Sequence, residues 1–391
     1  MSTILSNRVQ KIKPSATLVV NEKAKQLKAQ GVHIVSMGSG EPDFDTPINI
    51  QTAATQAISA GETRYTAVDG TPQLKKAICE KFKRENGLEY SDNEVMVSSG
   101  GKQVFYNLCQ AILNKGDEVI IPSPYWVSYP DMVLLADATP VFIETGLEQE
   151  FKITAEQLES SLNANTKLLV LNSPSNPTGA VYTKSEIESL GAVLEKHPHV
   201  NVISDDIYEH IRWEDDEFVN IAMACPKLKD RTIILNGVSK AYAMTGWRIG
   251  YAAGPEEIIK AMKKIQGQST SNPSSISQAA ALEAISGDQS FINMMVAAFE
   301  RRHNFLVDSL NAIDGIECPQ SRGAFYSFPR VQGLIDRLGL KNDVEFSTYC
   351  LDKISLALVP GSAFGAPGYV RLSFATSMDN LKLAIERLSN I

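Results

Sequence analysis

The residues of this chain that could do chemistry follow short apolar runs typical of strands, and a lysine is the most reactive of them. Lys240 comes three residues after the run TIILNG (232–237). A lysine just beyond a buried strand can have its pKa lowered, which makes its amine a nucleophile. Eight residues later, Arg248 follows the small turn Thr245-Gly246. An arginine at that point suits a phosphate group.

Other polar and aromatic residues follow the neighbouring runs. The run EVMVSS leads into Gly101 and Lys102, and a glycine at a helix start exposes backbone N–H groups to an anion. Three later runs are each followed by residues that could bind a ligand: Trp126 follows the run at 117–122, Asn176 follows that at 167–173, and Asp205 with Tyr208 stands at the end of that at 201–206. The adjacent carboxylates of Asp205 and Asp206 need a partner at the end of an apolar strand, and a buried cation would serve as well as a metal. Taken singly, each residue is compatible with an ordinary turn or core position.

Together these residues match the needs of pyridoxal 5'-phosphate (PLP). Its aldehyde needs a lysine, its phosphate needs N–H donors, and its ring nitrogen needs a carboxylate that keeps it protonated. Its 3-hydroxyl needs a neutral hydrogen-bond partner, and its ring needs a face to stack on. The set therefore predicts a PLP site in which Lys240 carries the cofactor as a Schiff base. The Asp205-Asp206 pair alone offers too few ligands for a metal site, so no metal is expected.

The elements that must position this set alternate between strand and helix patterns. Strand-like runs occur at 94–99, 117–122, 139–144, 167–173, 201–206, 232–237 and 248–254. Helical patterns lie between them, for example at 102–114, 184–197 and 256–267. This alternation predicts an α/β fold with a mostly parallel sheet between helices. Ligands of such sheets bind outside the carboxyl ends of the strands, where the candidate residues stand.

The two ends of the chain have a different pattern. Long helices are predicted at 16–30 and 289–312, and a last helix at 378–390. Short strands, AFYSFP, SLALVP and YVRLSF, lie among the C-terminal helices. We expect a large domain over 46–290 and a smaller α+β domain built from 1–45 and 291–391.

Composition narrows the classes of protein. Of the 391 residues, 43% are hydrophobic and 21% charged, which is typical of a folded chain. The net charge of −8 argues against a nucleic-acid partner, which needs a basic face. Five scattered cysteines without a CxxC pair indicate reduced thiols. No apolar run approaches the ~20 residues of a membrane span, and the first residues do not resemble a secretory signal, so a cytoplasmic protein is expected.

The segment SKAYAMTGWRIGY (239–251) resembles the PLP-lysine motif of class I aminotransferases, which adopt PLP fold type I. Four other blocks resemble the same family in the same order: SGEPDFDTP (39–47), SPYWVSYP (123–130), NSPSNPTG (172–179) and SDDIYEH (204–210). The similarity spans nearly the whole chain. The nearest group is the bacterial aspartate aminotransferases of the branch that includes the aspartate/prephenate aminotransferases.

The resemblance implies a role for each residue of the cofactor site. Lys240 forms the Schiff base and later moves the substrate proton, and Asp205 pairs with the ring nitrogen. Tyr208 and Asn176 hydrogen-bond the 3'-oxygen, and Trp126 stacks on the ring. The residues that border the phosphate are Gly101, Lys102 and Arg248, together with Tyr65, which reaches the phosphate of a neighbouring subunit. A homodimer is therefore expected.

The resemblance also implies how the substrate is held. Arg371 grips the α-carboxylate through a bidentate fork, with Gly40, Asn176 and Trp126 close to the same part of the substrate. The side-chain carboxylate of a dicarboxylic substrate meets Lys102, with help from Ser15 and Thr17. The expected activity is a ping-pong transfer of an amino group between aspartate or glutamate and a 2-oxo acid such as 2-oxoglutarate, with prephenate as a further candidate substrate.

One departure from the family's pattern affects the phosphate site. Many relatives have Ser or Thr three residues before the lysine, where it donates to the phosphate. This chain has Gly237 there, and Ser239 directly precedes Lys240. The phosphate site is therefore expected to differ slightly, and Ser239 is left without an assigned role.

Three other readings stay open at this point. A fold type I lyase, such as a C–S lyase, would share Lys240, Asp205, Tyr208 and Arg248, but it would release pyruvate and ammonia. An aminotransferase with a different amino-acid specificity would share the whole cofactor site. A ligand-sensing module without activity would need a DNA-binding segment, and no basic helix-turn-helix extension is visible.

Overall fold

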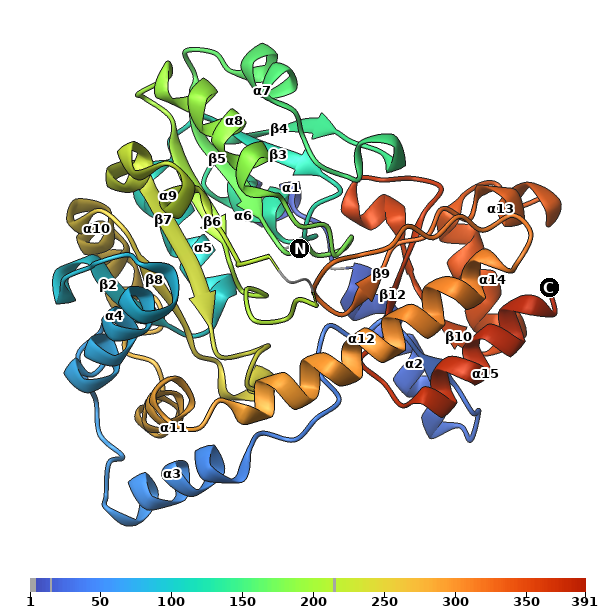
Figure 1. Cartoon of the computed structure of the whole chain (residues 1–391), viewed down its shortest axis with the longest axis horizontal. Coiled ribbons are helices and arrows are strands. Elements are labelled where there is room, and N and C mark those ends of the chain that lie inside the picture. The colour runs from blue at the N-terminus through green and yellow to red at the C-terminus, as the bar shows by residue number, and fades with distance from the viewer. Residues whose placement is uncertain (1–4, 15, 214–215) are drawn as a thin grey trace.

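A seven-stranded sheet forms the centre of the computed structural model, which describes residues 5–14, 16–213 and 216–391 (Figure 1). Its strands are, in sheet order, β2 (Val95–Ser98), β8 (Gly250–Ala253), β7 (Thr232–Gly237), β6 (Asn201–Asp205), β5 (Thr166–Asn172), β3 (Glu118–Ser123) and β4 (Thr139–Glu144). All neighbours are parallel except for β8, which is antiparallel to both β2 and β7. The predicted mostly parallel sheet is confirmed, and each of its seven strands lies within two residues of the bounds predicted for it, whereas the predicted strand SLALVP forms two short strands in different sheets.

Both faces of this sheet are buried, which explains why its strands are apolar at successive positions. On β7, for example, Ile233 and Leu235 pack on one face and Ile234 on the other. One face is covered by α5 (Gly101–Ile112), α6 (Tyr129–Leu135) and α10 (Glu256–Gly267). The other is covered by α4 (Pro72–Asn86), α7 (Ala155–Ser161), α8 (Lys184–Glu195), α9 (Ile221–Ala224) and α11 (Ser275–Ser286), with α3 (Ile48–Ser59) packed on α11.

A second hydrophobic core is built from both ends of the chain. The N-terminal strand β1 (Val35–Ser36) pairs in parallel with the C-terminal strand β10 (Leu356–Ala357). Beside them, β11 (Val359–Pro360), β12 (Val370–Ser373) and β9 (Tyr326–Ser327) form a small antiparallel sheet. The surrounding helices are α2 (Ala16–Ala29), α12 (Ser290–Asn311), α13 (Gln332–Arg337), α14 (Asp343–Ile354) and α15 (Met378–Ser389).

The long helix α12 connects the two parts of the molecule. Figure 1 shows it running from beside α11 to the C-terminal helices. Its first turns contribute Ile292 to the core under α4 and α11, and its later turns contribute Leu306 and Leu310 to the second core. This arrangement fits a large and a small unit, and the domain bounds 46–290 and 1–45 with 291–391 stay a prediction.

The remaining elements are short. They are α1 (Asn7–Lys11) and the 3-10 helices η1 (Asp92–Glu94), η2 (Leu147–Gln149), η3 (Pro226–Arg231), η4 (Thr245–Trp247) and η5 (Gly361–Phe364). Among the residues that the structure describes, no helix combines the length and apolar character needed to cross a membrane.

Candidate active site

The predicted site residues meet at a cavity of about 300 Å³ at the carboxyl ends of β5, β6 and β7. The small unit closes it with the segment 38–41, Tyr326 and Arg371. The predicted residues that line it are Gly40, Gly101, Lys102, Trp126, Asn176, Asp205, Tyr208, Lys240, Arg248 and Arg371. Because parallel strands bring their carboxyl ends to one edge, side chains far apart in the sequence converge here.

Lys240 lies on the loop after β7, and its amine is held between the two units. Its Nζ atom donates a hydrogen bond to the backbone oxygen of Gly40 at 2.5 Å. Burial lowers the pKa of Lys240 to about 8, Glu41 opposes this shift, and Arg371 reinforces it. A lysine with such a pKa is largely neutral just above pH 8, which is the form that attacks a carbonyl carbon.

Asp205 ends β6 with its carboxylate at the cavity. Its Oδ2 atom accepts a hydrogen bond from Tyr129 Oη at 2.5 Å, and its Oδ1 atom accepts one from the backbone N–H of Ile207 at 3.3 Å. Burial raises the pKa of Asp205 to about 6, and the hydrogen bond from Tyr129 limits the rise. The carboxylate at the cavity is therefore largely ionised at neutral pH and can pair with a cation.

The neighbouring Asp206 does not reach the cavity. Its carboxylate accepts hydrogen bonds from Ser204 Oγ at 2.6 Å and from Asn220 Nδ2 at 2.7 Å. Burial raises the pKa of Asp206 well above its ordinary value, and the nearby Glu209 adds to the rise. The two adjacent carboxylates thus lie in different environments, because Asp205 borders the cavity whereas Asp206 accepts hydrogen bonds from two neutral donors.

The guanidinium of Arg248 stands at the start of helix α5. Its Nη1 atom donates to the Thr245 backbone oxygen at 2.8 Å, and its Nη2 atom to that of Ser99 at 3.3 Å. Gly100, with φ 90°, precedes the helix, and a Cβ atom there would lie 2.0 Å from Arg248 Nη2. The backbone N–H groups of a helix start beside a guanidinium form a site for an anion such as a phosphate.

The packing of β7 on β8 accounts for Gly237, the departure noted in the sequence. A Cβ atom at Gly237 would lie 2.9 Å from Gly250 Cα and 2.9 Å from the backbone oxygen of Ile249. A Ser or Thr at this position therefore does not fit the observed backbone. Ser239, which had no assigned role, is buried and lines the cavity.

Arg371, on β12, supplies a buried cation on the small-unit side of the cavity. It is 2% exposed, and its guanidinium lies 4.4 Å from the centre of the Tyr326 ring. Its Nη1 atom donates to Asn176 Oδ1 and its Nη2 atom to the Gly38 backbone oxygen, both at 2.9 Å. Within the described ranges, Arg371 forms no ion pair and its Nε atom has no hydrogen-bond partner, so the charge remains available to a carboxylate.

Lys102 and Trp126 border the cavity from α5 and from the loop before α6. The Lys102 Nζ atom lies 5.2 Å from the centre of the Trp126 ring. Burial lowers the pKa of Lys102, Arg248 reinforces the shift, and Asp131 opposes it. Lys102 therefore adds a cation to the cavity on a different element from Arg371.

Several cavity residues carried no prediction. Tyr129 lies in the SPYWVSYP block, and Asn172 ends β5, where its Nδ2 atom donates to the Asp205 backbone oxygen at 2.9 Å. Position in a motif or at a strand end could have identified both. Glu41, in the SGEPDFDTP block, accepts a hydrogen bond from Thr245 Oγ1 at 2.6 Å. Tyr326, whose hydroxyl is 2.9 Å from that of Tyr208, lies in the predicted strand AFYSFP, but nothing in the sequence there marks it as a site residue.

Three predicted residues are not brought into the cavity. Tyr65 is 92% exposed and does not line it, so its role at a neighbouring subunit stays a prediction. Ser15 lies outside the described residues, and so does the side chain of Thr17.

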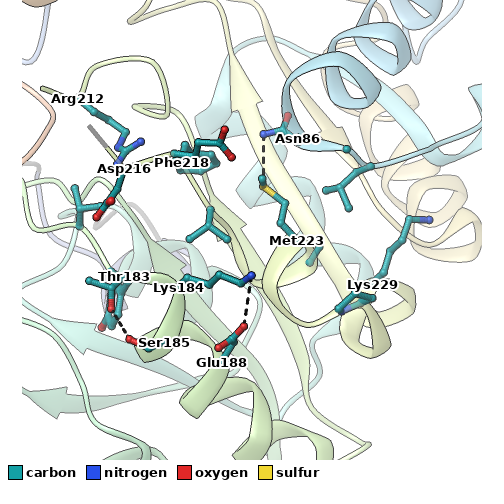
Figure 2. A pocket seen from close by; sticks show the side chains of 18 of the residues that line it. Asn86, Thr183, Lys184, Ser185, Glu188, Arg212, Asp216, Phe218, Met223 and Lys229 are labelled. Atoms are coloured by element: carbon teal, nitrogen blue, oxygen red, sulfur yellow. Dashed lines mark hydrogen bonds and ion pairs between the residues drawn. The ribbon is translucent and has the colours of Figure 1, made fainter. Parts of the chain in front are cut away.

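A larger hollow of about 1380 Å³ is separate from this site (Figure 2). Lys184 and Glu188 of α8 line it, with 3.9 Å between Lys184 Nζ and Glu188 Oε1. Asn86 and Met223 also line it, with 3.8 Å between Asn86 Nδ2 and Met223 Sδ. Its charges are mixed, and none of the predicted catalytic or binding residues is among the described residues that line it. Volume alone therefore does not identify the functional site.

The groups around the smaller cavity fit PLP. An amine with a lowered pKa, a buried carboxylate and a guanidinium beside a helix start face the same space. The absence of a side chain at Gly100 also lets the Arg248 guanidinium lie against the start of α5, where the cation and the backbone N–H groups can bind a phosphate together.

Comparisons with known proteins agree with this chemistry. The family model described as "Aminotransferase class I and II" matches residues 32–388. The aspartate/prephenate aminotransferase of Nitrosomonas europaea is 57% identical over 99% of both chains. That of Cereibacter sphaeroides is 52% identical over 98% of this chain and 97% of its own.

Two solved structures share the fold. The aspartate aminotransferase from Rhizobium meliloti has a TM-score of 0.95 and 47% identity, covering 100% of this chain and 98% of its own. The aspartate aminotransferase from Thermus thermophilus with maleate has a TM-score of 0.94 and 44% identity, covering 100% of both chains. The PLP fold type I architecture is confirmed. The chain therefore belongs to the class I and II aminotransferases and is a PLP-dependent enzyme.

Proposed function

We propose that this aminotransferase moves the amino group between aspartate or glutamate and a 2-oxo acid such as 2-oxoglutarate, with prephenate as a further candidate substrate. The observation that carries the proposal is the pair of cations, Arg371 and Lys102, on one cavity of about 300 Å³. A dicarboxylic substrate offers one carboxylate to each. The names of the relatives support the same substrate class, and so does maleate, a dicarboxylate, in the structure of the Thermus thermophilus enzyme.

PLP, when bound, supplies an electron sink that stabilises negative charge at the substrate Cα atom. Asp205 would pair with its ring nitrogen, Tyr208 and Asn176 with its 3'-oxygen, and Trp126 would lie on its ring. Arg248, Gly101 and the start of α5 would hold its phosphate, with Lys102 at their border.

Other residues of the chain bind the substrate and move its proton. Arg371 binds the α-carboxylate, and Gly40 and Asn176 restrict how the substrate turns. Lys240, which carries the cofactor between substrates, takes the proton from the substrate Cα atom as a neutral amine. Its lowered pKa keeps a large share of the amine neutral at slightly alkaline pH. Because residues of both units line the cavity, the substrate is held on one side by Arg371 and on the other by the groups that face Lys240.

We also infer that the enzyme acts as a homodimer in the cytoplasm. Tyr65 is 92% exposed, and nearby α3 exposes the apolar side chains of Ile48 and Ile58. An apolar surface of this kind is suited to a second copy of the chain, whose phosphate site Tyr65 would reach. The five cysteines, all within the described ranges, are free thiols, as is usual in a reducing compartment.

The variant Lys102→Ala tests the substrate assignment. The rate constant for conversion of the enzyme by aspartate, measured by stopped-flow absorbance, should fall by roughly 10- to 100-fold, since a charged hydrogen bond contributes about 1.5–3 kcal/mol. The rate with alanine, which has no second carboxylate, is the control and should change less than about threefold. The PLP dissociation constant is measured in parallel because Lys102 also borders the phosphate site. An unchanged rate with aspartate would show that Lys102 does not bind the distal carboxylate.

A further inference from the structure

Tyr129 occupies a fixed position directly behind the carboxylate of Asp205. It is the first residue of α6 and is 1% exposed. Its ring lies 4.8 Å from that of Phe105 and 5.2 Å, edge-on at 86°, from that of Trp126. These contacts hold the ring between α5 and the loop that carries Trp126, and they direct the hydroxyl at Asp205.

The hydroxyl of Tyr129 can only act as the donor in this pair. Burial raises the pKa of Tyr129 well above its ordinary value, and the neighbouring Asp205 raises it further. The hydroxyl therefore keeps its proton and donates a hydrogen bond to the carboxylate oxygen. A donor at 2.5 Å favours the ionised form of a carboxylate that burial would otherwise make neutral.

Asp205 has few other contacts that fix its orientation. Its Oδ1 atom has the longer bond of 3.3 Å from the Ile207 N–H group, and its backbone oxygen is bonded by Asn172. The Tyr129 bond is thus the shortest hydrogen bond to the carboxylate. Without it, only the longer bond from the Ile207 N–H group would hold the carboxylate, which would rotate about χ2 and take up a proton more readily.

From this geometry we propose that Tyr129 is a positioning residue, which holds Asp205 in the orientation and ionised state needed to pair with the ring nitrogen of PLP. The inference deepens the proposed function and rests on the assignment of Asp205 to that nitrogen. The hydroxyl of Tyr129 acts through Asp205, whereas the ring packs in the core against Phe105 and Trp126. The hydroxyl and the ring can be separated experimentally because phenylalanine keeps the ring.

The first test is the PLP dissociation constant of the Tyr129→Phe apoenzyme, measured by absorbance and fluorescence titration. Loss of a buried hydrogen bond to a charged group should weaken PLP binding by roughly 10- to 100-fold. Tyr125→Phe is the matched control, because Tyr125 lies on the same loop but stacks on Phe142 at 4.9 Å. The control should bind PLP as the parent enzyme does. Equal affinity of Tyr129→Phe and the parent would overturn the proposal.

A PLP analogue with carbon in place of the ring nitrogen separates positioning from simple core packing. It offers Asp205 no nitrogen, so Tyr129→Phe should bind it no more weakly than the parent enzyme does. A purely structural role of the hydroxyl would instead weaken binding of both compounds equally, and that result would contradict the proposal.

The Asp205→Asn background distinguishes a failure of this inference from a failure of the site assignment. If Tyr129 acts through Asp205, adding Tyr129→Phe to Asp205→Asn should change PLP affinity by less than about threefold. Additive losses would overturn the inference about Tyr129 alone. Unchanged PLP affinity in Asp205→Asn itself would overturn both the assignment of Asp205 and the inference about Tyr129. The proposed function is tested independently, by measuring transamination with the parent enzyme.

Discussion

The Nζ atom of Lys240 lies 2.5 Å from the backbone oxygen of Gly40, so the reactive amine joins the end of β7 to the N-terminal segment of the small unit. A neutral hydrogen-bond acceptor thus orients the amine, and burial lowers its pKa. The contact between the two units and the lowered pKa of the amine are consequences of the same packing.

The rate at which the apoenzyme captures PLP should rise with pH through a midpoint near 8. Burial lowers the pKa of Lys240 to about 8, so the neutral amine predominates above that pH and the ammonium form below it. Stopped-flow absorbance at a series of pH values measures this rate. A midpoint near that of an exposed lysine would show that burial does not control the amine.

Asp205→Asn should stabilise the apoenzyme at pH 7–8 although it weakens PLP binding. The pKa of Asp205 is raised from 3.8 to about 6 in the folded protein. The protonated carboxyl therefore stabilises the fold fully below pH ~4, and this stabilisation is lost as the pH rises through ~6. Above pH 6 the buried charge costs up to roughly 3 kcal/mol, which asparagine avoids. The free energy of unfolding in urea, measured without cofactor, should rise by roughly 1–3 kcal/mol at pH 8 and little at pH 4. A less stable variant at pH 8 would contradict this account.

Gly100→Ala should weaken PLP binding at the phosphate. The new Cβ atom would displace the Arg248 guanidinium from the start of α5, because it would lie 2.0 Å from Nη2. Gly116→Ala is the matched control, since Gly116 also has a positive φ, 99°, but has no atom within 4 Å of an added Cβ. Both variants carry backbone strain, and only the first should raise the PLP dissociation constant, by about tenfold or more. Equal affinities in the two variants would exclude this role for Arg248.

The sequence was sufficient to predict the sheet and most of the site for a physical reason. Buried parallel strands have continuous apolar runs, and the polar residues that follow them, such as Asp205 and Asn176, must meet at one edge. The resemblance to a family then added Arg371 and Gly40, which lie on no long strand.

Other features depend on contacts that no local pattern records. Tyr326 reaches the cavity through the pairing of β9 with β12, residues remote in the sequence. Asp205 and Asp206 have the same chemistry, and only the packing of Ser204 and Asn220 around Asp206 separates their roles. The tight β7–β8 contact that requires Gly237 is likewise a property of the folded sheet.

The most direct test of the central claim is the absorbance spectrum of the purified, PLP-loaded protein titrated with aspartate. We predict that the band of the Lys240-bound cofactor is converted to that of pyridoxamine 5'-phosphate, with one oxaloacetate formed per site, and that 2-oxoglutarate restores the first band. A parallel titration with an S-alkylcysteine tests the lyase alternative: release of the thiol, pyruvate and ammonia with an unchanged cofactor band would indicate a lyase. A protein that acquires no visible band after addition of PLP would contradict the central claim altogether.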